Sequence, residues 1–339
     1  MKTIVGIFQS ALLCFVLLSA VSCGDKACYH ELTGYAQGGT YSVKFKSEGR
    51  FDVRAAGKAV DSILTMIDTT LSGYNKGSQL SRYNSGAPVA PNGMFKEIFS
   101  ISKRLYDETG GALDMASGPL FDAWGFGFTR DSLPSSSMVD SLRSVCGMNK
   151  LDGNMSPVDP SVRPKLNFNS IAQGYSCDKI AEYLHSFGIK DMLVNIGEIY
   201  CEGLNPSGKP WTIGIDMPVD GNMELGSKGL VGTWQGDGRG CGVVTSGNYR
   251  KYYVKNGRKY SHTVDPRTGY PVNHSLLSAT IVAPDATLAD AYATYCMVIG
   301  LEEAKRFIEG SDGLEGYLVY EEGGNMSEWA SSGFNLARK

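Results

Sequence analysis

The sequence lacks the motifs that identify several large protein classes. None of its eight cysteines forms a Cys-x-x-Cys pair, so zinc-ribbon and thioredoxin-like chemistry have no support. It has no dinucleotide-binding glycine fingerprint, and the glycine-rich run 236–242 lacks the Lys-Ser/Thr ending that a phosphate-binding loop requires. The 32 basic and 35 acidic residues are mixed along the chain and give a net charge of −3, which argues against nucleic acid as a partner.

What the 339-residue sequence does contain is typical of a globular enzyme. Hydrophobic residues make up 42% and charged residues 20%, which is enough apolar material for a sizeable core. The 42 glycines and 18 tyrosines favour strand faces joined by many tight turns.

Hydrophobic periodicity places helices early and strands late. Helices are predicted over residues 53–71, 94–109 and 170–188. Strands are predicted over residues 40–45, 192–196, 211–215, 241–245, 249–254, 276–283 and 314–320. Asn256-Gly257 predicts a hairpin turn. This order indicates an α+β fold with a mainly antiparallel sheet flanked by helices.

The N-terminus predicts export and lipid attachment. Lys2 precedes the apolar run from Ile4 to Val21, and Ser22-Cys23 follows it. This arrangement resembles a bacterial lipoprotein signal, in which the peptide is cut before the cysteine and the cysteine carries the lipid. A plain signal peptide or a short membrane anchor is the alternative.

The expected domain organisation follows from that signal. We expect a signal peptide over residues 1–22, a lipidated tether over residues 23–33, and one domain over residues 34–339. The mature protein would then be a lipoprotein held at a bacterial membrane on the periplasmic side.

Three polar clusters follow one another in the second half of the chain. The first is Thr245-Ser246-Gly247-Asn248, and the second places His262 just before the turn residues Asp265-Pro266. The third has Asp290 and Thr294 four residues apart in a segment with helical character, so both oxygens point from one helix face. A hard cation such as Mg²⁺ can be held by two oxygen ligands placed in this way.

Each cluster alone also has a purely structural interpretation. Asp290 could sit in the first turn of its helix, and Thr294 could bond back to the carbonyl four residues earlier. A single His before a turn is more often a structural residue than a catalytic base. The ordered run of all three clusters is what favours a functional site, because turn formation does not require the other two.

Further motifs extend this pattern over most of the chain. They are Gly39-Thr40, Leu71-Ser72-x-Tyr74, Gly111-Ala-Leu-Asp114, Trp124-Gly-Phe-Gly127, Ser170-Ile-Ala-Gln-Gly174 and Val194-Asn-Ile-Gly-Glu198. With these residues the chain resembles the ApbE family of FAD:protein FMN transferases from about Gly39 to about Gly300. That resemblance implies an ApbE-like fold, FAD as substrate, Mg²⁺ as cofactor, and an acceptor protein that receives FMN on a Thr or Ser with release of AMP.

The resemblance also implies roles for single residues. Asp290, Thr294 and the backbone carbonyl of Ser170 match the metal site, and His262 matches the general base that takes the acceptor proton. Ala293 stands where the fuller family pattern can have an Asp, so the metal here should have one carboxylate fewer. Asp265 can orient His262 or hold the turn, and we favour the turn.

A second group of residues matches the flavin contacts of the family. It comprises Gly38, Tyr74, Ala112, Leu113, Asp114, Asn167, Gln173 and Val264. Tyr74 is expected to stack on the flavin, with a core tyrosine as the alternative, and Asp114 is expected to accept hydrogen bonds from adenine or ribose. Gly38 replaces a common Met, Asn167 a common Asp, and Gln173 a common Lys or Glu, so the flavin pocket departs from the family pattern.

Two other functions stay open from the sequence. One is an FAD pyrophosphatase that releases FMN and AMP to water, because altered pocket residues can change the attacking group. The other is a flavin-binding lipoprotein that stores or delivers the cofactor without chemistry. The expected partners are FAD, a redox-complex subunit or other acceptor protein, and the membrane.

Overall fold

The computed structural model describes residues 27–128, 133–220, 222, 227–249, 252–255 and 257–337. The predicted signal peptide and the predicted lipidation site Cys23 lie outside these residues. Among the helices of the described residues, none is long and apolar enough to span a bilayer.

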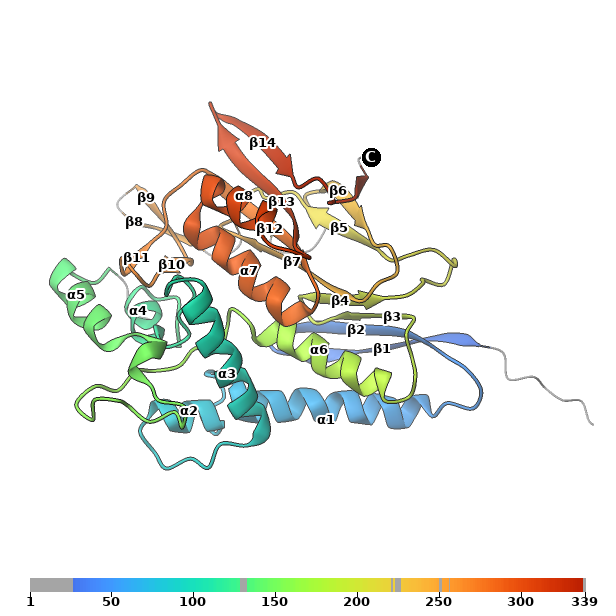
Figure 1. Ribbon diagram of the computed structural model, residues 1–339, viewed down its shortest axis with the longest axis horizontal. Coiled ribbons are helices and arrows are strands. Elements are labelled where there is room, and N and C mark those ends of the chain that lie inside the picture. The colour runs from blue at the N-terminus through green and yellow to red at the C-terminus, as the bar shows by residue number, and fades with distance from the viewer. Residues whose placement is uncertain are drawn as a thin grey trace, which may run out of the picture.

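An eight-stranded sheet forms the centre of the molecule, with strand order β1-β2-β3-β4-β7-β12-β13-β14 (Figure 1). Its strands are β1 (Cys28–Ala36), β2 (Gly39–Ser47), β3 (Met192–Asn195), β4 (Ile199–Glu202), β7 (Cys241–Gly247), β12 (Leu276–Ala283), β13 (Glu315–Glu322) and β14 (Asn325–Ala330). Every neighbouring pair is antiparallel. The predicted antiparallel α+β fold is therefore confirmed.

Smaller sheets and hairpins surround this sheet. They are the three-stranded sheet of β5 (Thr212–Asp216), β6 (Leu230–Gln235) and β15 (Leu336–Ala337), the hairpin of β8 (Tyr252–Lys255) and β9 (Arg258–Ser261), and the pair β10 (Val264–Asp265) and β11 (Tyr270–Pro271). β8 and β9 pair antiparallel from Tyr252↔Ser261 to Lys255↔Arg258, which confirms the predicted hairpin.

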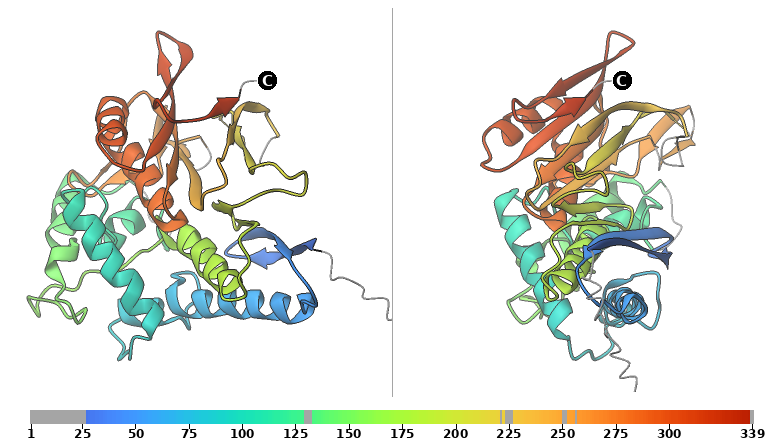
Figure 2. Two further views of the ribbon diagram at one scale, coloured as in Figure 1. Left: turned by 45° about the vertical axis from the view of Figure 1, so that its right-hand side comes forward. Right: turned by 90° about the vertical axis from the view of Figure 1, so that its right-hand side faces the viewer.

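Eight α-helices and one short 3₁₀ helix lie within the described residues. They are α1 (Val53–Leu71), α2 (Gln79–Asn84), α3 (Gly93–Glu108), α4 (Gly118–Ala123), α5 (Ser136–Val145), η1 (Met148–Lys150), α6 (Ala172–His185), α7 (Ala286–Ile299) and α8 (Leu301–Glu309). Figure 2 shows α1, α6 and α7 on one side of the central sheet and the β5–β6 strands on the other.

Apolar side chains on both faces of the central sheet hold these layers together. On one face, Val43 and Val194 pack with Ile180 of α6, and Val244 and Ile281 pack with residues of α7 and α8. On the other face the core is built by β4, β7, β13 and the β5–β6 strands, with members Cys201, Trp211, Ile213, Ile215, Trp234, Val243, Val282, Tyr317, Val319 and Phe334. Burial on both faces fixes the strand register, because a shift of one residue would turn each apolar side chain to the wrong face.

Two sequence-based boundaries are corrected. The tether expected over residues 23–33 is wrong from Cys28 onward, because β1 begins there and pairs with β2 from Cys28↔Ser47 to Ala36↔Gly39. The residues of β1 are polar and partly exposed, as is usual for an edge strand. Backbone hydrogen bonds to β2, and not a buried apolar face, hold β1 in place. The strand expected from Tyr249 has its described part at Tyr252–Lys255, and Tyr249 itself is in a turn.

Candidate active site

The two predicted metal ligands lie on α7, where this helix faces the start of α6. Asp290 is only 5% exposed, and its Oδ2 accepts a hydrogen bond of 3.1 Å from the backbone N–H of Gly174. One turn further along α7, Thr294 Oγ1 lies 3.5 Å from Ser246 Oγ at the end of β7. The first and third polar clusters of the sequence therefore meet here.

A glycine permits this close approach of α6 to α7. A Cβ atom on Gly174 would lie 2.1 Å from the carbonyl oxygen of Ala286 and 2.9 Å from Asp290 Cβ. Asp178 strengthens the contact, because its carboxylate accepts the backbone N–H groups of Ala286 and Thr287 at 2.9 and 2.8 Å. The start of α7 is thus fixed to α6, which places Asp290 against the N-terminal turn of α6.

The electrostatics of Asp290 suit a cation ligand. Burial raises the pKa of Asp290 to about 7, a backbone hydrogen bond from Gly174 opposes the rise, and the nearby charge of Asp178 adds to it. A buried carboxylate of this kind gains most from a neighbouring positive charge.

The donor atoms available at this place are oxygen atoms, which a hard cation such as Mg²⁺ takes. No group of three His, Cys, Asp or Glu that could hold a metal occurs in the described parts of the chain. The available donors are the carboxylate of Asp290, the hydroxyl of Thr294 and the carbonyl of Ser170, in the turn just before α6. Oxygen-only ligands completed by water are typical of Mg²⁺.

His262 is half-buried and lies in a segment held on both sides by one side chain. Asn248 Oδ1 accepts hydrogen bonds from the Ser261 hydroxyl and, at 2.9 Å, from Thr263 Oγ1. The backbone N–H of Asn248 in turn donates to the carbonyl of Leu277 in β12, at 3.0 Å. The first polar cluster therefore fixes the backbone around His262 to the central sheet. The sequence showed Asn248 in its motif, but gave no signal for this role.

The turn after His262 is built as the sequence predicted. Asp265 accepts hydrogen bonds from the backbone N–H and the guanidinium of Arg267, and Gly269 has a positive φ of 81°. These bonds support the turn-holding role favoured for Asp265. The side chain of Val264, by contrast, is buried with Leu120 and Trp124, so a flavin contact for it stays a prediction.

An aromatic cluster that was not predicted lies beside His262. Phe126 is 6.4 Å from the His262 ring in an edge-on arrangement and 5.1 Å from the Tyr253 ring, with which it stacks. Tyr260 continues the stack, 5.2 Å from Tyr253 and 5.8 Å from Trp124. Rigid rings on this side restrict the space around the candidate base. In the sequence, only the Trp124-Gly-Phe-Gly127 part of this aromatic cluster could be recognised as a motif.

Tyr74 is placed where a ligand could reach it. Its side chain is 63% exposed, so the alternative of a core tyrosine is wrong. The ring lies edge-on to Phe128 at 5.0 Å, and its hydroxyl accepts a hydrogen bond of 3.3 Å from Asn169 Nδ2. Asn169 directly precedes Ser170, so Tyr74 lies near the start of α6 and hence near the candidate metal site.

The predicted loop Ala112-Leu113-Asp114 is buried more deeply than a ligand-facing loop requires. Ala112 and Leu113 belong to the core, and Asp114 Oδ1 accepts the backbone N–H groups of Ala116 and Met148 at 2.9 and 3.0 Å. Burial raises the pKa of Asp114 to about 6. In the structure Asp114 holds this loop together, and its contact with FAD stays a prediction.

The remaining predicted flavin contacts surround the start of α6. Gln173 donates from Nε2 to the Ile196 carbonyl at 2.9 Å, and Asn167 Oδ1 accepts the backbone N–H of Asn169 at 3.0 Å. Gly38 has a positive φ of 83° in the β1–β2 turn. Its neighbour Gln37 donates to Ser176 of α6. Residues far apart in the sequence are thus gathered at one helix end.

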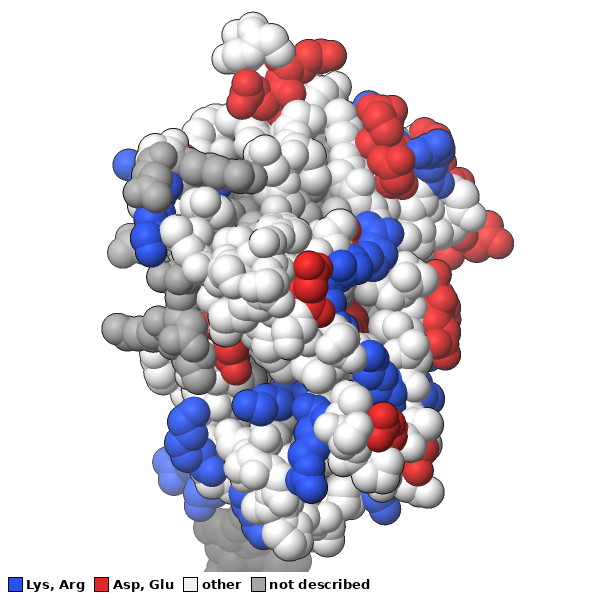
Figure 3. Space-filling view, turned by 90° about the vertical axis from the view of Figure 1, so that its left-hand side faces the viewer, with Lys and Arg blue, Asp and Glu red and all other residues white. Residues whose placement is uncertain are grey.

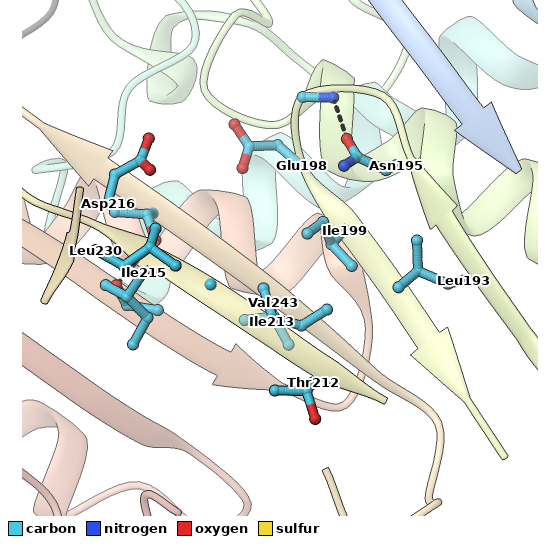
Figure 4. A pocket seen from close by; sticks show the side chains of 14 residues that line it. Leu193, Asn195, Glu198, Ile199, Thr212, Ile213, Ile215, Asp216, Leu230 and Val243 are labelled. Atoms are coloured by element: carbon cyan, nitrogen blue, oxygen red, sulfur yellow. Dashed lines mark hydrogen bonds between the residues drawn. The ribbon is translucent and has the colours of Figure 1, made fainter. Parts of the chain in front are cut away.

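A cavity of about 310 Å³ lies on the face of the central sheet opposite α6 and α7. It is lined by residues of β3, β4, β5, β6, β7 and β12 and by the loop of Gly197 and Glu198 (Figure 4). Figure 4 shows the Glu198 and Asp216 carboxylates at one end of the cavity and mostly apolar side chains along the rest. A Cβ on Gly197 would lie 2.6 Å from Gln173 Nε2, so the cavity begins next to a predicted flavin contact.

Comparisons with known proteins show the family of this chain. The ApbE family model matches residues 37–318. The FAD:protein FMN transferase of Escherichia coli K12 is 32% identical over 84% of this chain and 82% of its own length, and that of Haemophilus influenzae is 31% identical over 98% and 97%. The solved flavin transferase ApbE of Vibrio cholerae superposes with a TM-score of 0.78 at 32% identity, over 91% of this chain and 99% of its own. The chain therefore belongs to the ApbE family.

Proposed function

We propose that this chain is a Mg²⁺-dependent FAD:protein FMN transferase. The observation that carries the proposal is the convergence at the end of β7, where Ser246 contacts Thr294 and Asn248 holds the segment of His262. Phosphoryl transfer needs a cation at the phosphates and a base for the attacking hydroxyl. The residues proposed for these roles, Thr294 and His262, are each tied to the end of β7, Thr294 through Ser246 and the His262 segment through Asn248.

In the proposed reaction a Thr or Ser hydroxyl of the acceptor attacks the FMN phosphorus of FAD. A phosphoester bond forms, the bond to the AMP phosphate breaks, and AMP leaves with the bridging oxygen. His262 takes the proton of the attacking hydroxyl. Asn248 keeps the His262 backbone in place during this transfer, because it bonds to residues on both sides of it.

Asp290, Thr294 and the Ser170 carbonyl would hold the Mg²⁺. Bound there, Mg²⁺ offsets the negative charge that develops on the pyrophosphate. The chain's own contribution is a rigid ligand frame, because Gly174 and Asp178 fix α6 to the start of α7.

Charges of the surrounding face are compatible with an anionic substrate. Figure 3 shows the face that carries α4, α5 and the β8–β9 hairpin, with Lys and Arg gathered in its lower half and Asp and Glu mainly toward its edges. Basic side chains of this kind favour the approach of a pyrophosphate through long-range attraction.

We also infer membrane attachment through Cys23. The apolar run 4–21 and Ser22-Cys23 support it, and β1 begins soon afterwards at Cys28, which leaves a short linker to the domain. In a bacterial host, incorporation of labelled palmitate should be lost in Cys23→Ser and kept in Cys14→Ser. Equal labelling of Cys23→Ser would refute the anchor.

The transferase proposal is tested with the chain, FAD, Mg²⁺ and a candidate acceptor domain. An FMN-sized gain in acceptor mass, absent in the acceptor Thr/Ser variant and matched by released AMP, is the expected result. Sustained AMP release from FAD alone would instead identify a pyrophosphatase. FAD binding without AMP under any condition would favour the flavin-storing lipoprotein.

A further inference from the structure

Two cysteines lie directly opposite each other in the central sheet. Cys201 of β4 and Cys241 of β7 are register partners, two residues along from the pair Ile199↔Val243. Both thiols project to the same face, because Cys201 belongs to the core cluster under the β5–β6 strands and Cys241 packs against that cluster. Directly opposed residues of antiparallel strands have Cα atoms roughly 4.5–5.5 Å apart, within the range that a disulfide spans.

The two thiols also influence each other. The neighbouring thiol of Cys241 raises the pKa of Cys201, and burial adds to that rise. The remaining cysteines of the described residues lie elsewhere: Cys28 is exposed on β1, and Cys146, Cys177 and Cys296 belong to three other core clusters. Among the cysteines of the described residues, Cys201 and Cys241 are therefore the pair that is placed to form a disulfide.

We propose that Cys201 and Cys241 form a disulfide that locks the β5–β6 insertion onto the central sheet. The chain between the two cysteines contains all of β5 and β6, which form one wall of the 310 Å³ cavity. Other contacts already hold the base of this insertion in place. The Gly203 N–H donates to the Gly238 carbonyl at 2.9 Å, and the Gly236 N–H donates to the Trp211 carbonyl at 2.9 Å. The bond therefore requires little rearrangement.

The chemistry is thiol–disulfide exchange with an external disulfide, either glutathione disulfide or a protein disulfide oxidant. Cys241 is partly exposed and attacks first, which forms a mixed disulfide and releases one thiol of the oxidant. Cys201 then attacks Cys241 Sγ and releases the second thiol. The two cysteines lose two electrons and two protons in total, and the oxidant is reduced to two thiols.

The position of the pair gives the bond a structural consequence. Cross-linking restricts the unfolded chain between the two cysteines, so the oxidised protein should be more stable than the reduced one. The bond also fixes the β5–β6 wall of the cavity to the central sheet. The linked cysteines lie next to Ile199 and Val243, which line the same cavity. The disulfide does not change the opposite face of the sheet, on which Ser246 and α7 lie.

The test uses the full-length chain in detergent, equilibrated with glutathione disulfide, alkylated and digested without reduction. We expect a peptide that joins Cys201 to Cys241, loses the link on reduction, and forms equally in Cys28→Ser. The wild type should have a Tm roughly 5 °C higher oxidised than reduced, whereas Cys241→Ser should have the same Tm in both states.

Three results would overturn the proposal. They are alkylation of both cysteines after oxidation, glutathione retained on Cys241 beside an alkylated Cys201, and a confirmed cross-link without any gain in Tm. Because wild type is compared with itself, poor folding of a variant cannot produce these results.

Discussion

The two ends of the candidate site are built in different ways. At the metal end, Asp290 is 5% exposed, and α6 and α7 meet at a glycine that leaves no room for a side chain. At the flavin end, Tyr74 is 63% exposed, and Gly38 lies in a turn where a Cβ would meet nothing within 4 Å. At the buried end Asp290 and Thr294 match the family motif, whereas Gly38 at the open end replaces its common Met. Close packing constrains the buried end, while the open end can vary at small cost.

Loss of the candidate base should have the largest effect on the reaction. His262→Ala should lower kcat by roughly 10²–10⁴-fold, because no group then takes the acceptor proton, while FAD binding is kept. His185→Ala, on the exposed end of α6, is the matched control and should keep full activity. Single-turnover transfer and FAD titration measure the two quantities. Transfer retained in His262→Ala would remove this residue from the mechanism.

Loss of the buried carboxylate should come next. Asp290→Asn should lower the rate by roughly 10²–10³-fold and abolish its dependence on Mg²⁺, since the metal loses its charged ligand. Asp265→Asn changes a carboxylate that holds a turn and should leave the Mg²⁺ dependence as it is. Initial rates over a Mg²⁺ series distinguish the two. An unchanged Mg²⁺ response in Asp290→Asn contradicts the assignment.

The close helix contact can be tested by adding one methyl group. Gly174→Ala should lower the free energy of unfolding by about 1–3 kcal/mol and weaken the Mg²⁺ response, because its Cβ would overlap the Ala286 carbonyl. Gly57→Ala in α1 is the control, since its Cβ would meet only Leu32 at 3.6 Å, and it should be neutral or stabilising. Denaturant unfolding checks both. Equal stabilities would mean that the α6–α7 contact is loose.

At the open end the expected effect is smaller and confined to binding. Tyr74→Ala should raise KM for FAD by roughly 3–10-fold with little change in kcat, because a stacking surface is lost. Tyr74→Phe keeps the ring and loses only the hydrogen bond from Asn169, so it should behave like the wild type. Steady-state kinetics with varied FAD decides this. A fall in kcat alone would place Tyr74 in the chemistry instead.

The last prediction concerns the dependence of stability on pH and leaves the reaction itself aside. Burial raises the pKa of Asp114 from 3.8 to about 6, so protonation is favoured in the folded state. This carboxyl therefore contributes stability that is full below pH 3.8 and is lost as pH rises through about 6. Asp114→Asn should remove that slope, on the order of 2–3 kcal/mol across the window. Urea unfolding from pH 4 to 7 tests it, and parallel curves for the two proteins would contradict it.

Periodic segments could be predicted closely, whereas segments defined by local turns could not. The helix expected over residues 53–71 has those bounds, and so does the strand expected over 276–283, because each has a regular buried face. The helix expected from Ser170 begins at Ala172, because the backbone N–H of Ile171 donates to the Phe168 carbonyl in a preceding turn. Hydrophobic spacing contains no information about such a turn.

The same division applies to the site. By itself the sequence determined the residue types and their order, from which the family and the candidate groups His262, Asp290 and Thr294 followed. Only the tertiary structure decided that Asp290 is buried against α6, that Asn248 holds the segment of His262, and that Cys201 faces Cys241. These facts depend on strand register and helix packing between residues far apart in the chain, and local sequence patterns do not specify either.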